Sequence, residues 1–390
     1  MVANTGRGLA RAREIYENRD AHAKHLKSEG NRIIGYVCIY PMIEMITASD
    51  MVPYRIFGDM REPITRADAH MATVVCPFMR SCLDTGMKGR YDFLDGVVFA
   101  HVCDVTCMIP GMWRQAIATP YTHFIDIPHT THKAAREHFR SMLSDFQITL
   151  EEFSGTKLSN ERLAKAVSDH NRQRRLVRQL YELKKPDPPL ISGVETLRVM
   201  KALMSLPVEE GNSLLQEVIQ EIKTRKNPVQ TKHARLMVWG SIIDDTAFLE
   251  MVESLDANVV MDDTCVGSRA FFSDVPATED PLDGLARYYL GDLKCPRTLR
   301  EVAAKGQRKD YRADLEERFG YLKDYAAGWN VNGVILQSVR YCDGHGYEVP
   351  AIKDYFESLG LPCIYLEHDY TEGALAPLRT RVQGLTEIIG

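Results

Sequence analysis

The sequence predicts an α/β fold in which two parallel-sheet domains of Rossmann or flavodoxin type are joined by a helical insert. Strand patterns alternate with helical patterns near both ends of the chain, as is typical of parallel sheets. A chain of 390 residues is also too long for one ordinary hydrophobic core. We therefore expect an N-terminal helix in residues 1–30, a first α/β domain in 31–128, a helical region in 129–230 and a second α/β domain in 231–390.

The first α/β domain is expected to follow a charged, solvated helix that covers residues 9–28. Apolar runs bounded by turn residues predict its strands, and the run Phe93–Ala100 is the clearest of them. The predicted strands cover residues 32–39, 54–57, 93–100 and 122–127, and the predicted helices cover 42–51 and 71–85.

The helical region carries the basic run Asn171–Arg178, which could contact nucleic acid. The net charge of −5 and the pI near 6.2 instead favour an ordinary solvated helix face, because nucleic-acid binders usually show a basic excess. We therefore expect no nucleic-acid partner.

The second α/β domain repeats the alternation of the first. Its predicted strands cover residues 235–240, 258–261, 333–336 and 362–366, and its predicted helices cover 244–255 and 349–359, followed by a C-terminal helix. The turn 341–346 contains two glycines, and its amides could face an anion.

Hydrophobicity and cysteine content indicate a cytoplasmic protein. The first residues lack the apolar core of a signal peptide, and no apolar run reaches the roughly 18–20 residues that a membrane span needs. In a reducing cytosol, the nine cysteines are more typical of metal binding or catalysis than of disulfides.

Four thiols surround the strand at 93–100, namely Cys76, Cys82, Cys103 and Cys107. Their spacings match neither a structural zinc site nor a compact ferredoxin motif, so any cluster would take ligands from distant loops. Three thiols, Cys103, Cys265 and Cys342, each follow directly after a predicted strand, where α/β proteins place ligands. A metal site, disulfides and simple core packing all remain open at this point.

Two cysteines are assigned to the hydrophobic core, because Cys38 and Cys363 lie inside the apolar runs 33–39 and 363–366. A nucleotide hydrolase is poorly supported, because no Walker A motif is present. A Cys–His hydrolase built on His101 and Cys103 is also disfavoured, since no nucleophile-elbow pattern occurs.

A set of short motifs in both α/β domains points to a known family. They are Cys76-Pro-Phe with Arg80, Asp95-Gly, Cys103-Asp104, Gly240-Ser241 with Asp244-Asp245, Asp263-Thr-Cys265-Val-Gly267-Ser-Arg269, Tyr341-Cys342-Asp343, Leu366-Glu367-His-Asp369-Tyr370 and Leu378-Arg379-Thr-Arg381. In this order the chain resembles the iron–sulfur subunits of the benzoyl-CoA reductase and 2-hydroxyacyl-CoA dehydratase family. Its length and Gly111-Met112-Trp113 are most similar to a smaller subunit of ATP-dependent benzoyl-CoA reductase.

This resemblance implies a cofactor, partners and a reaction. Cys76, Cys103 and Cys342 would ligate one [4Fe-4S] cluster. A homologous iron–sulfur subunit of the same fold and an ATP-hydrolysing iron–sulfur activator would be partners, and the substrate would be a CoA thioester. The reaction would be the two-electron reduction of an aromatic thioester to a cyclic dienoyl-CoA, whereas the dehydratases of the family expel a hydroxyl group.

Other assignments stay open. Cys107 or Cys265 could extend the ligand set to a larger cluster of double-cubane type, and Cys82 and Cys295 have no assigned role. His101, His345 and Asp104 could relay protons or could hydrogen-bond to cluster sulfurs. A zinc-bound, non-catalytic scaffold and a metal-free CoA- or nucleotide-binding enzyme are the alternatives from other functional classes.

Overall fold

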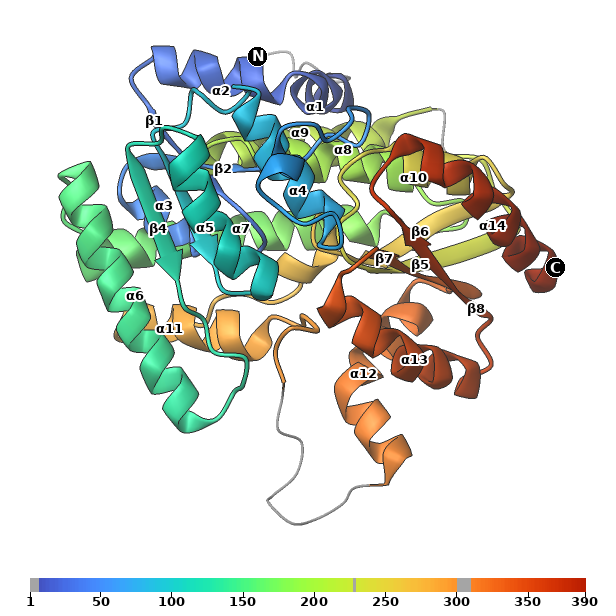
Figure 1. Ribbon diagram of the computed structural model, residues 1–390. Coiled ribbons are helices and arrows are strands. Elements are labelled where there is room, and N and C mark those ends of the chain that lie inside the picture. Colours follow the sequence, from blue (N-terminus) through green and yellow to red (C-terminus); the bar gives the residue numbers. More distant parts are fainter. Residues whose placement is uncertain (1–6, 227–228, 300–309) are drawn as a thin grey trace.

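Two parallel sheets form the framework of the protein (Figure 1), which confirms the predicted α/β class. The computed structural model describes residues 7–226, 229–299 and 310–390. The first sheet has the strand order β2-β1-β3-β4 and the second has the order β6-β5-β7-β8. The strands are β1 (Arg32–Tyr36), β2 (Met51–Arg55), β3 (Gly96–Ala100), β4 (Tyr121–Ile125), β5 (Ala234–Gly240), β6 (Ala257–Asp263), β7 (Gly333–Val339) and β8 (Cys363–His368).

Both sheets share one topology, the start of the flavodoxin-like strand order. Within each sheet every neighbouring pair is parallel. In each sheet, the order in which successive strands are added changes side at one point. This point lies between β1 and β3 in the first sheet and between β5 and β7 in the second. Ligands of such sheets bind outside the carboxyl ends of the strands at that reversal point. The fold therefore offers two equivalent ligand-binding edges.

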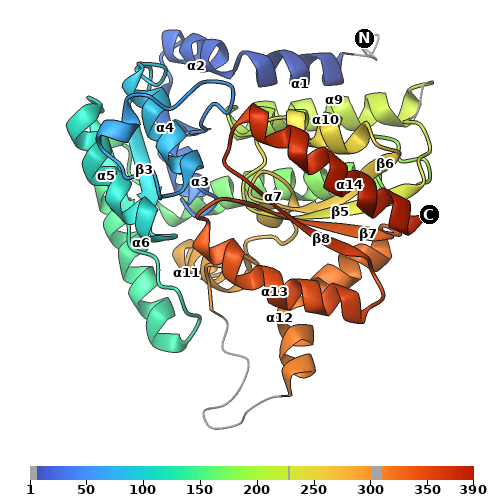
Figure 2. The ribbon, with the colours of Figure 1, turned by 45° about the vertical axis from the view of Figure 1, so that its right-hand side comes forward.

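Helices surround the sheets (Figure 2). They are α1 (Gly8–Glu17), α2 (Arg19–Ser28), α3 (Ile43–Ala48), α4 (Pro77–Met87), α5 (Asp104–Ala116), α6 (Lys133–Ser154), α7 (Asn160–Glu182), α8 (Gly193–Leu203), α9 (Val208–Thr224), α10 (Ala247–Glu253), α11 (Pro281–Arg287), α12 (Tyr311–Gly328), α13 (Asp343–Ser358) and α14 (Leu375–Ile389). In the described parts of the chain, none of these helices combines the length and the apolar character that crossing a membrane requires.

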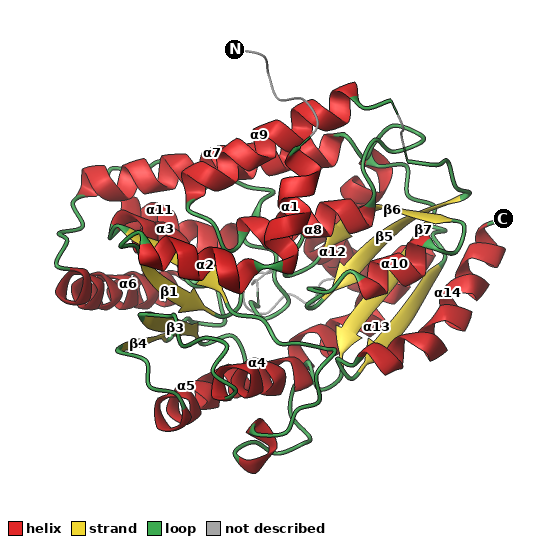
Figure 3. Ribbon diagram, turned by 90° about the horizontal axis from the view of Figure 1, so that it is seen from above, coloured by secondary structure: helices red, strands yellow, loops and turns green. Residues whose placement is uncertain are grey.

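The helical segment between the sheets packs against both of them (Figure 3). Helix α7 contacts α3 beside the first sheet, while α8 contacts β6 of the second sheet. Apolar residues of α7, α8 and α9 belong to the same buried cluster as residues of both sheets. The segment therefore holds the sheets together, and it does more than connect them in sequence.

The N-terminal region differs from the single solvated helix that its charge pattern predicts. It forms two helices, α1 and α2, which meet at Asn18. The Asn18 side chain donates to the Glu14 carbonyl at 3.2 Å and so competes with the helical backbone. Ala12 and Ile15 on α1 are buried, because this helix packs against α8 and α9. Residues 1–6 of the predicted N-terminal helix lie outside the described residues.

Several predicted boundaries are shifted by tertiary packing. Met51 begins β2, although the pattern assigns it to a helix. Helix α13 begins at Asp343, so both glycines of the predicted turn lie in its first turn. Helix α10 is shorter than predicted at both ends. The most consequential shift is that β1 ends at Tyr36, which leaves Cys38 beyond the strand.

The basic run on α7 is only partly solvated, in contrast to the prediction. Arg172 and Arg175 are exposed, but Arg174 is buried and pairs with the buried Glu44 of α3. Helical periodicity turns one side of α7 toward α3, and Arg174 lies on that side. The run therefore serves the packing of α7 against α3.

Candidate functional site

One cavity lies where the carboxyl ends of the two sheets meet, and we call it the thiol cavity. Its free volume is about 120 Å³, well above the roughly 10–15 Å³ that a single water needs. Loops that follow β1, β3, β5, β6 and β7 all contribute to its lining. Six of the nine cysteines line it: Cys38, Cys76, Cys103, Cys265, Cys295 and Cys342.

The three cysteines that the resemblance assigns to a cluster share one local geometry. Cys76 is the N-cap of α4, Cys103 of α5 and Cys342 of α13. The first N–H groups of a helix have no intrahelical acceptor, and the helix dipole adds positive potential at this end. Three helix N-termini therefore favour negatively charged sulfur at the cavity wall.

Local sequence explains two of these helix starts. Pro77 occupies the first position of α4, where its missing N–H costs no hydrogen bond. At α5, the Thr106 hydroxyl accepts from the backbone N–H groups of Val102 and Cys103, each at 3.0 Å. The same hydroxyl donates to the Cys103 carbonyl at 2.7 Å. The Cys103 backbone is thus held by hydrogen bonds at the end of β3.

Burial controls the protonation of these thiols. It raises the pKa of Cys76 to about 12, against hydrogen bonds from the Phe78 and Met79 backbone that act in the opposite direction. Burial also raises the pKa of Cys342 well above the ordinary thiol value. Both groups are therefore thiols at neutral pH when no cation is near. A metal that binds them must release their protons, because thiolate is the ligand form.

A hydrogen-bonded chain connects two of the lining thiols. Arg269 Nη1 lies 3.0 Å from His345 Nε2, and His345 Nδ1 lies 3.3 Å from Cys342 Sγ. Because arginine can only donate, Nε2 accepts and the ring proton sits on Nδ1, which points to the sulfur. Burial and the Arg269 charge lower the pKa of His345 well below its ordinary value, so the ring is neutral. Arg269 Nη1 also donates to Cys265 Sγ at 3.5 Å.

Buried positive charge accompanies the thiols. Arg269 pairs with the buried Asp263 at 3.1 Å. Arg55 and Arg297 line the cavity, and the exposed fraction of each is below 10%. Within the described residues, the Nε–H of Arg55 and that of Arg297 are buried without an acceptor. An anionic occupant of the cavity would offset this unpaired guanidinium charge.

Four residues considered from the sequence lie outside the cavity: Cys82, His101, Asp104 and Cys107. Cys107 is exposed on α5, one helical turn after Cys103, and it does not line the cavity. His101 Nδ1 lies 2.6 Å from Asp126 Oδ1, and His101 is not part of the cavity wall. Cys82 is buried inside α4. Of the two histidine candidates, only His345 contacts a lining thiol.

Two lining thiols are not predicted by the sequence pattern. The pattern assigns Cys38 to the strand core, but this residue follows β1 and lines the cavity, as Cys103 does after β3. Cys295 has no role in the pattern, although Cys295-Pro296 repeats the Cys-Pro pair of Cys76-Pro77. That repeat is a signal that could have found it. Cys363 lies within β8 and is buried, as predicted.

The donor set fits an iron–sulfur cluster better than a single metal ion. Across residues 7–226, 229–299 and 310–390, no three His, Cys, Asp or Glu side chains converge closely enough to hold one ion. A cluster instead takes each thiolate on a separate iron atom, which spreads its ligands around the cluster body. Soft sulfur ligands, positive helix ends and buried arginines are the surroundings that an anionic iron–sulfur group requires.

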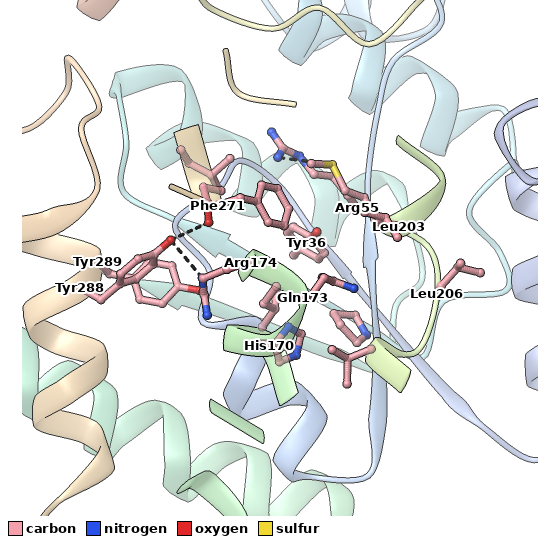
Figure 4. Close-up of a pocket in the computed structure, with 16 residues that line it drawn as sticks. Tyr36, Arg55, His170, Gln173, Arg174, Leu203, Leu206, Phe271, Tyr288 and Tyr289 are labelled. Carbon is pink, nitrogen blue, oxygen red and sulfur yellow. Dashed lines mark hydrogen bonds between the residues drawn. The ribbon is translucent and has the colours of Figure 1, made fainter. Parts of the chain in front are cut away.

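A second, smaller cavity of about 40 Å³ lies on the other side of Arg55, beside α7 (Figure 4). We call it the Arg174 cavity. Each nitrogen of Arg174 has a partner: Nη2 pairs with Glu44, Nη1 donates to Asn171 at 3.0 Å, and Nε donates to the Tyr288 hydroxyl at 3.3 Å. Tyr289 donates to Glu44 at 2.8 Å. These polar groups satisfy one another, so the Arg174 cavity supports the fold.

Comparison with known proteins adds an independent line of evidence. Residues 38–389 match the family model described as 2-hydroxyglutaryl-CoA dehydratase, D-component. A benzoyl-CoA reductase subunit of Thauera aromatica is 26% identical over 95% of both chains. The (R)-phenyllactyl-CoA dehydratase beta subunit of Clostridium sporogenes is 23% identical over the full length of both chains. The beta subunit of (R)-2-hydroxyglutaryl-CoA dehydratase from Acidaminococcus fermentans is 22% identical over 93% of both.

The matched region includes seven of the eight strands, all except β1, and all six cysteines of the thiol cavity. These relatives are subunits of enzymes that act on CoA thioesters. The chain belongs to the 2-hydroxyglutaryl-CoA dehydratase D-component family, which includes benzoyl-CoA reductase subunits.

Proposed function

We propose that this chain is the smaller iron–sulfur subunit of an ATP-dependent reductase that acts on an aromatic CoA thioester of the benzoyl-CoA type. Its site is the thiol cavity, where Cys76, Cys103 and Cys342 hold a [4Fe-4S] cluster. The observation that carries the proposal is the meeting of three helix N-cap cysteines at one cavity between the two sheets. The cluster supplies single electrons at low potential.

The residues of the chain bind and insulate the cluster. Thiolates of the three N-cap cysteines anchor it, and the helix ends offset its negative charge. Phe78, Met79, Val102 and Val105 contribute an apolar wall, which excludes water from the reducing centre. His345 keeps its Nδ1 proton directed at Cys342 Sγ, so it positions and tunes the sulfur.

The apolar wall also supports an aromatic substrate. A flat hydrocarbon ring gains from contact with aliphatic and aromatic side chains, whereas a polar acyl chain needs hydrogen-bond partners. The similarity to the benzoyl-CoA reductase polypeptide of Thauera aromatica over 95% of the chain agrees with this substrate class. As partners we propose a homologous subunit of the same fold and an ATP-hydrolysing iron–sulfur activator, and as the compartment the cytoplasm.

The second candidate function is the removal of a hydroxyl group from a 2-hydroxyacyl-CoA. It is favoured by the full-length match to the (R)-phenyllactyl-CoA dehydratase beta subunit, whose named substrate also carries an aromatic ring. The same three thiolates would serve either reaction.

An anaerobic assay distinguishes these candidates. The chain, co-purified with its partner subunit and supplied with activator, ATP and a low-potential electron donor, is offered benzoyl-CoA and (R)-phenyllactyl-CoA separately. We expect a cyclic dienoyl-CoA from benzoyl-CoA, formed only with continued ATP hydrolysis. Turnover of phenyllactyl-CoA alone would assign the dehydratase function, and inactivity with both thioesters would contradict the family-based proposal.

A further inference from the structure

A third cavity, with a free volume of about 660 Å³, is much larger than the other two. We call it the Lys201 cavity. It lies where the junction of α1 and α2 meets α8 and the loops that follow β2, β5 and β8. Its volume is within the range of roughly 300–1,000 Å³ that small-molecule sites occupy. The cavity is therefore large enough for a ligand of nucleotide size.

A buried polar network forms one wall of the Lys201 cavity. Tyr370 Oη lies 2.9 Å from Asp244 Oδ1 and 2.8 Å from Oδ2, and Lys201 Nζ donates to the Asp244 backbone carbonyl at 2.6 Å. Burial raises the pKa of Asp244, while the charge of Lys201 and the hydrogen bond from Tyr370 act in the opposite direction. Asp244 and Tyr370 belong to two motifs of the family resemblance, and neither residue lines the thiol cavity. The fold therefore brings them together at a different place.

The carboxylates that line the Lys201 cavity already have partners within the chain. The pairs are Glu17–Arg13, Asp20–Tyr54, Asp59–Arg90, Asp244–Lys201 and Asp245–Arg61, at 2.8, 2.7, 2.8, 3.5 and 3.1 Å. A cationic ligand would have to compete with one of these partners. The cavity is therefore poorly suited to a cation.

Hydrogen-bond donors, in contrast, are left over. Neither Arg19 nor Lys24 pairs with a carboxylate of the described residues, and Arg19 is only 7% exposed. Arg19 Nη2 donates to the Arg55 carbonyl at 2.8 Å, but its Nε–H has no acceptor in that part of the chain. Burial raises the pKa of Tyr16 to about 12, and its hydroxyl accepts from a backbone N–H at 3.1 Å, which leaves its proton available. Such donors suit a ligand rich in acceptors, above all a phosphate group.

Aromatic side chains line the same cavity, namely Tyr16, Phe57 and Tyr91. The Arg19 guanidinium and the Lys201 ammonium each lie 4.7 Å from the centre of the Phe57 ring. A flat heterocycle gains from contact with aromatic rings and guanidinium groups. A phosphate ion alone would leave most of the volume unfilled, whereas a phosphorylated nucleoside would use both kinds of surface.

One layer of side chains separates the Lys201 cavity from the thiol cavity. Arg55 lines the thiol cavity, and its carbonyl accepts from Arg19 of the Lys201 cavity. Phe78 also lines the thiol cavity, and its ring meets that of Tyr370 edge to face, with 5.3 Å between the ring centres. A ligand in the Lys201 cavity would thus lie next to the wall of the proposed cluster site.

We propose that the Lys201 cavity binds the adenosine diphosphate group of a nucleotide. Two molecules of the proposed reaction carry this group: the CoA thioester, and the ADP that the activator releases when it hydrolyses ATP. The choice of nucleotide therefore rests on the proposed function, whereas the preference for a phosphorylated ligand follows from the cavity itself.

Isothermal titration calorimetry on the full, anaerobically purified chain tests this site with CoA, ADP and inorganic phosphate separately. Lys24→Glu reverses a charge at the rim, and Ala21→Trp places a bulky ring at an exposed lining position on α2. The matched controls are Lys133→Glu on α6 and Ala10→Trp on α1, both exposed and outside the cavity. Far-UV circular dichroism checks the folding of each variant, and the iron content of each sample is measured.

We expect the wild type and both controls to bind CoA and ADP with the same Kd values, and K24E and A21W to bind them at least about tenfold more weakly. Similar Kd values for CoA and ADP would support the shared group as the ligand. Tighter binding of CoA would assign the site to the substrate, and tighter binding of ADP to the product of ATP hydrolysis. Inorganic phosphate should bind more weakly than either.

Three results would overturn the inference: no binding of either nucleotide, unchanged Kd values in both K24E and A21W, or phosphate binding as tight as that of the nucleotides. A chain that contains cluster iron but fails in one of these ways would leave the proposed cluster intact. A chain that binds nucleotide in the Lys201 cavity but holds no iron would contradict the proposed cluster alone.

Discussion

The two cavities that share Arg55 are built on opposite principles. In the Arg174 cavity, the arginine, Glu44 and two tyrosines saturate one another with hydrogen bonds. In the thiol cavity, the Nε–H groups of the lining residues Arg55 and Arg297 are buried and have no acceptor within the described part of the chain. Buried polar groups that satisfy one another stabilise a fold, whereas unsatisfied donors beside a cavity can bond to a group that enters it. The comparison assigns stability to one cavity and chemistry to the other.

The largest expected effect is the loss of enzymatic activity when one of the three N-cap cysteines of the thiol cavity is replaced. Cys76→Ala, Cys103→Ala or Cys342→Ala should each lower the turnover of the reconstituted complex by more than about 100-fold, because a thiolate ligand is a stronger determinant than the outer-shell partners that cost roughly 10–100-fold. The rate of thioester reduction and the iron content are measured together. The matched control is Cys363→Ala in β8, which should keep its activity. A comparable loss of activity in this control would show that the effect is not specific to the thiol cavity.

The next effect concerns stability. Arg174→Met leaves Glu44 as an unpaired charge in the interior and should cost about 3–5 kcal/mol in free energy of unfolding. Urea denaturation measures this change, and the double variant R174M/E44Q should recover part of it. Arg175→Met is the control, because Arg175 is exposed and its ion pair with Asp274 is worth at most about 1 kcal/mol. Equal losses in R174M and R175M would show that the buried network has no special role.

A pH dependence should also arise from the Arg174 cavity. Burial lowers the pKa of His170 to about 4 from an ordinary value of 6.5, and its Nε2 lies 2.9 Å from the Thr47 hydroxyl. Between pH 6.5 and 4 the unfolded chain therefore binds a proton that the folded chain excludes, so stability falls as pH falls. The loss due to His170 is about 3 kcal/mol over this range.

Denaturation curves of the wild type and His170→Gln between pH 7 and 4 measure this loss. The variant should lose less stability on acidification, while His25→Gln, a change at an exposed site on α2, should behave like the wild type. The same pH slope in wild type and H170Q would show that His170 does not carry the effect.

The smallest expected effect is a change in the reduction potential of the cluster proposed for the thiol cavity. The Nδ1–H group of His345 donates to Cys342 Sγ, and such a donor stabilises the reduced, more negative state of a bound cluster. His345→Ala removes this donor. The reduction potential should become more negative by roughly 60 mV, equivalent to about 1.4 kcal/mol for one electron. Anaerobic redox titration measures it, with iron content unchanged. An unaltered potential, matching that of the His101→Ala control outside the cavity, would reduce His345 to a packing role.

The sequence predicts the strands and their carboxyl ends, because the alternation of apolar runs with helical patterns is a local signal. The predicted position of Cys103 and Cys342 just beyond the carboxyl ends of two strands is therefore confirmed. The same reasoning does not reach Cys38, because a run of apolar residues continues past the point where β1 ends and the backbone turns to positive φ. The sequence pattern also does not predict the burial of Arg174, because its partner Glu44 is 130 residues away in the chain.

The convergence of the six thiols depends on how the two sheets face each other. No local pattern encodes that arrangement, which arises from the packing of α7, α8 and α9 against both sheets. The domain boundaries at residues 30, 128 and 230 remain a proposal. The helical region that they separate shares its buried core with both sheets, so we expect the chain to unfold as one cooperative unit.

The central claim is that Cys76, Cys103 and Cys342 anchor an iron–sulfur cluster. Mössbauer spectroscopy of the anaerobically purified, ⁵⁷Fe-enriched chain tests it most directly, since the spectrum identifies iron in tetrahedral sulfur coordination. We predict cluster iron in the wild-type chain and in C82A/C107A/C363A, and its loss from C76A/C103A/C342A. A wild-type spectrum without cluster iron, or one that the C76A/C103A/C342A substitutions leave unchanged, would contradict the account.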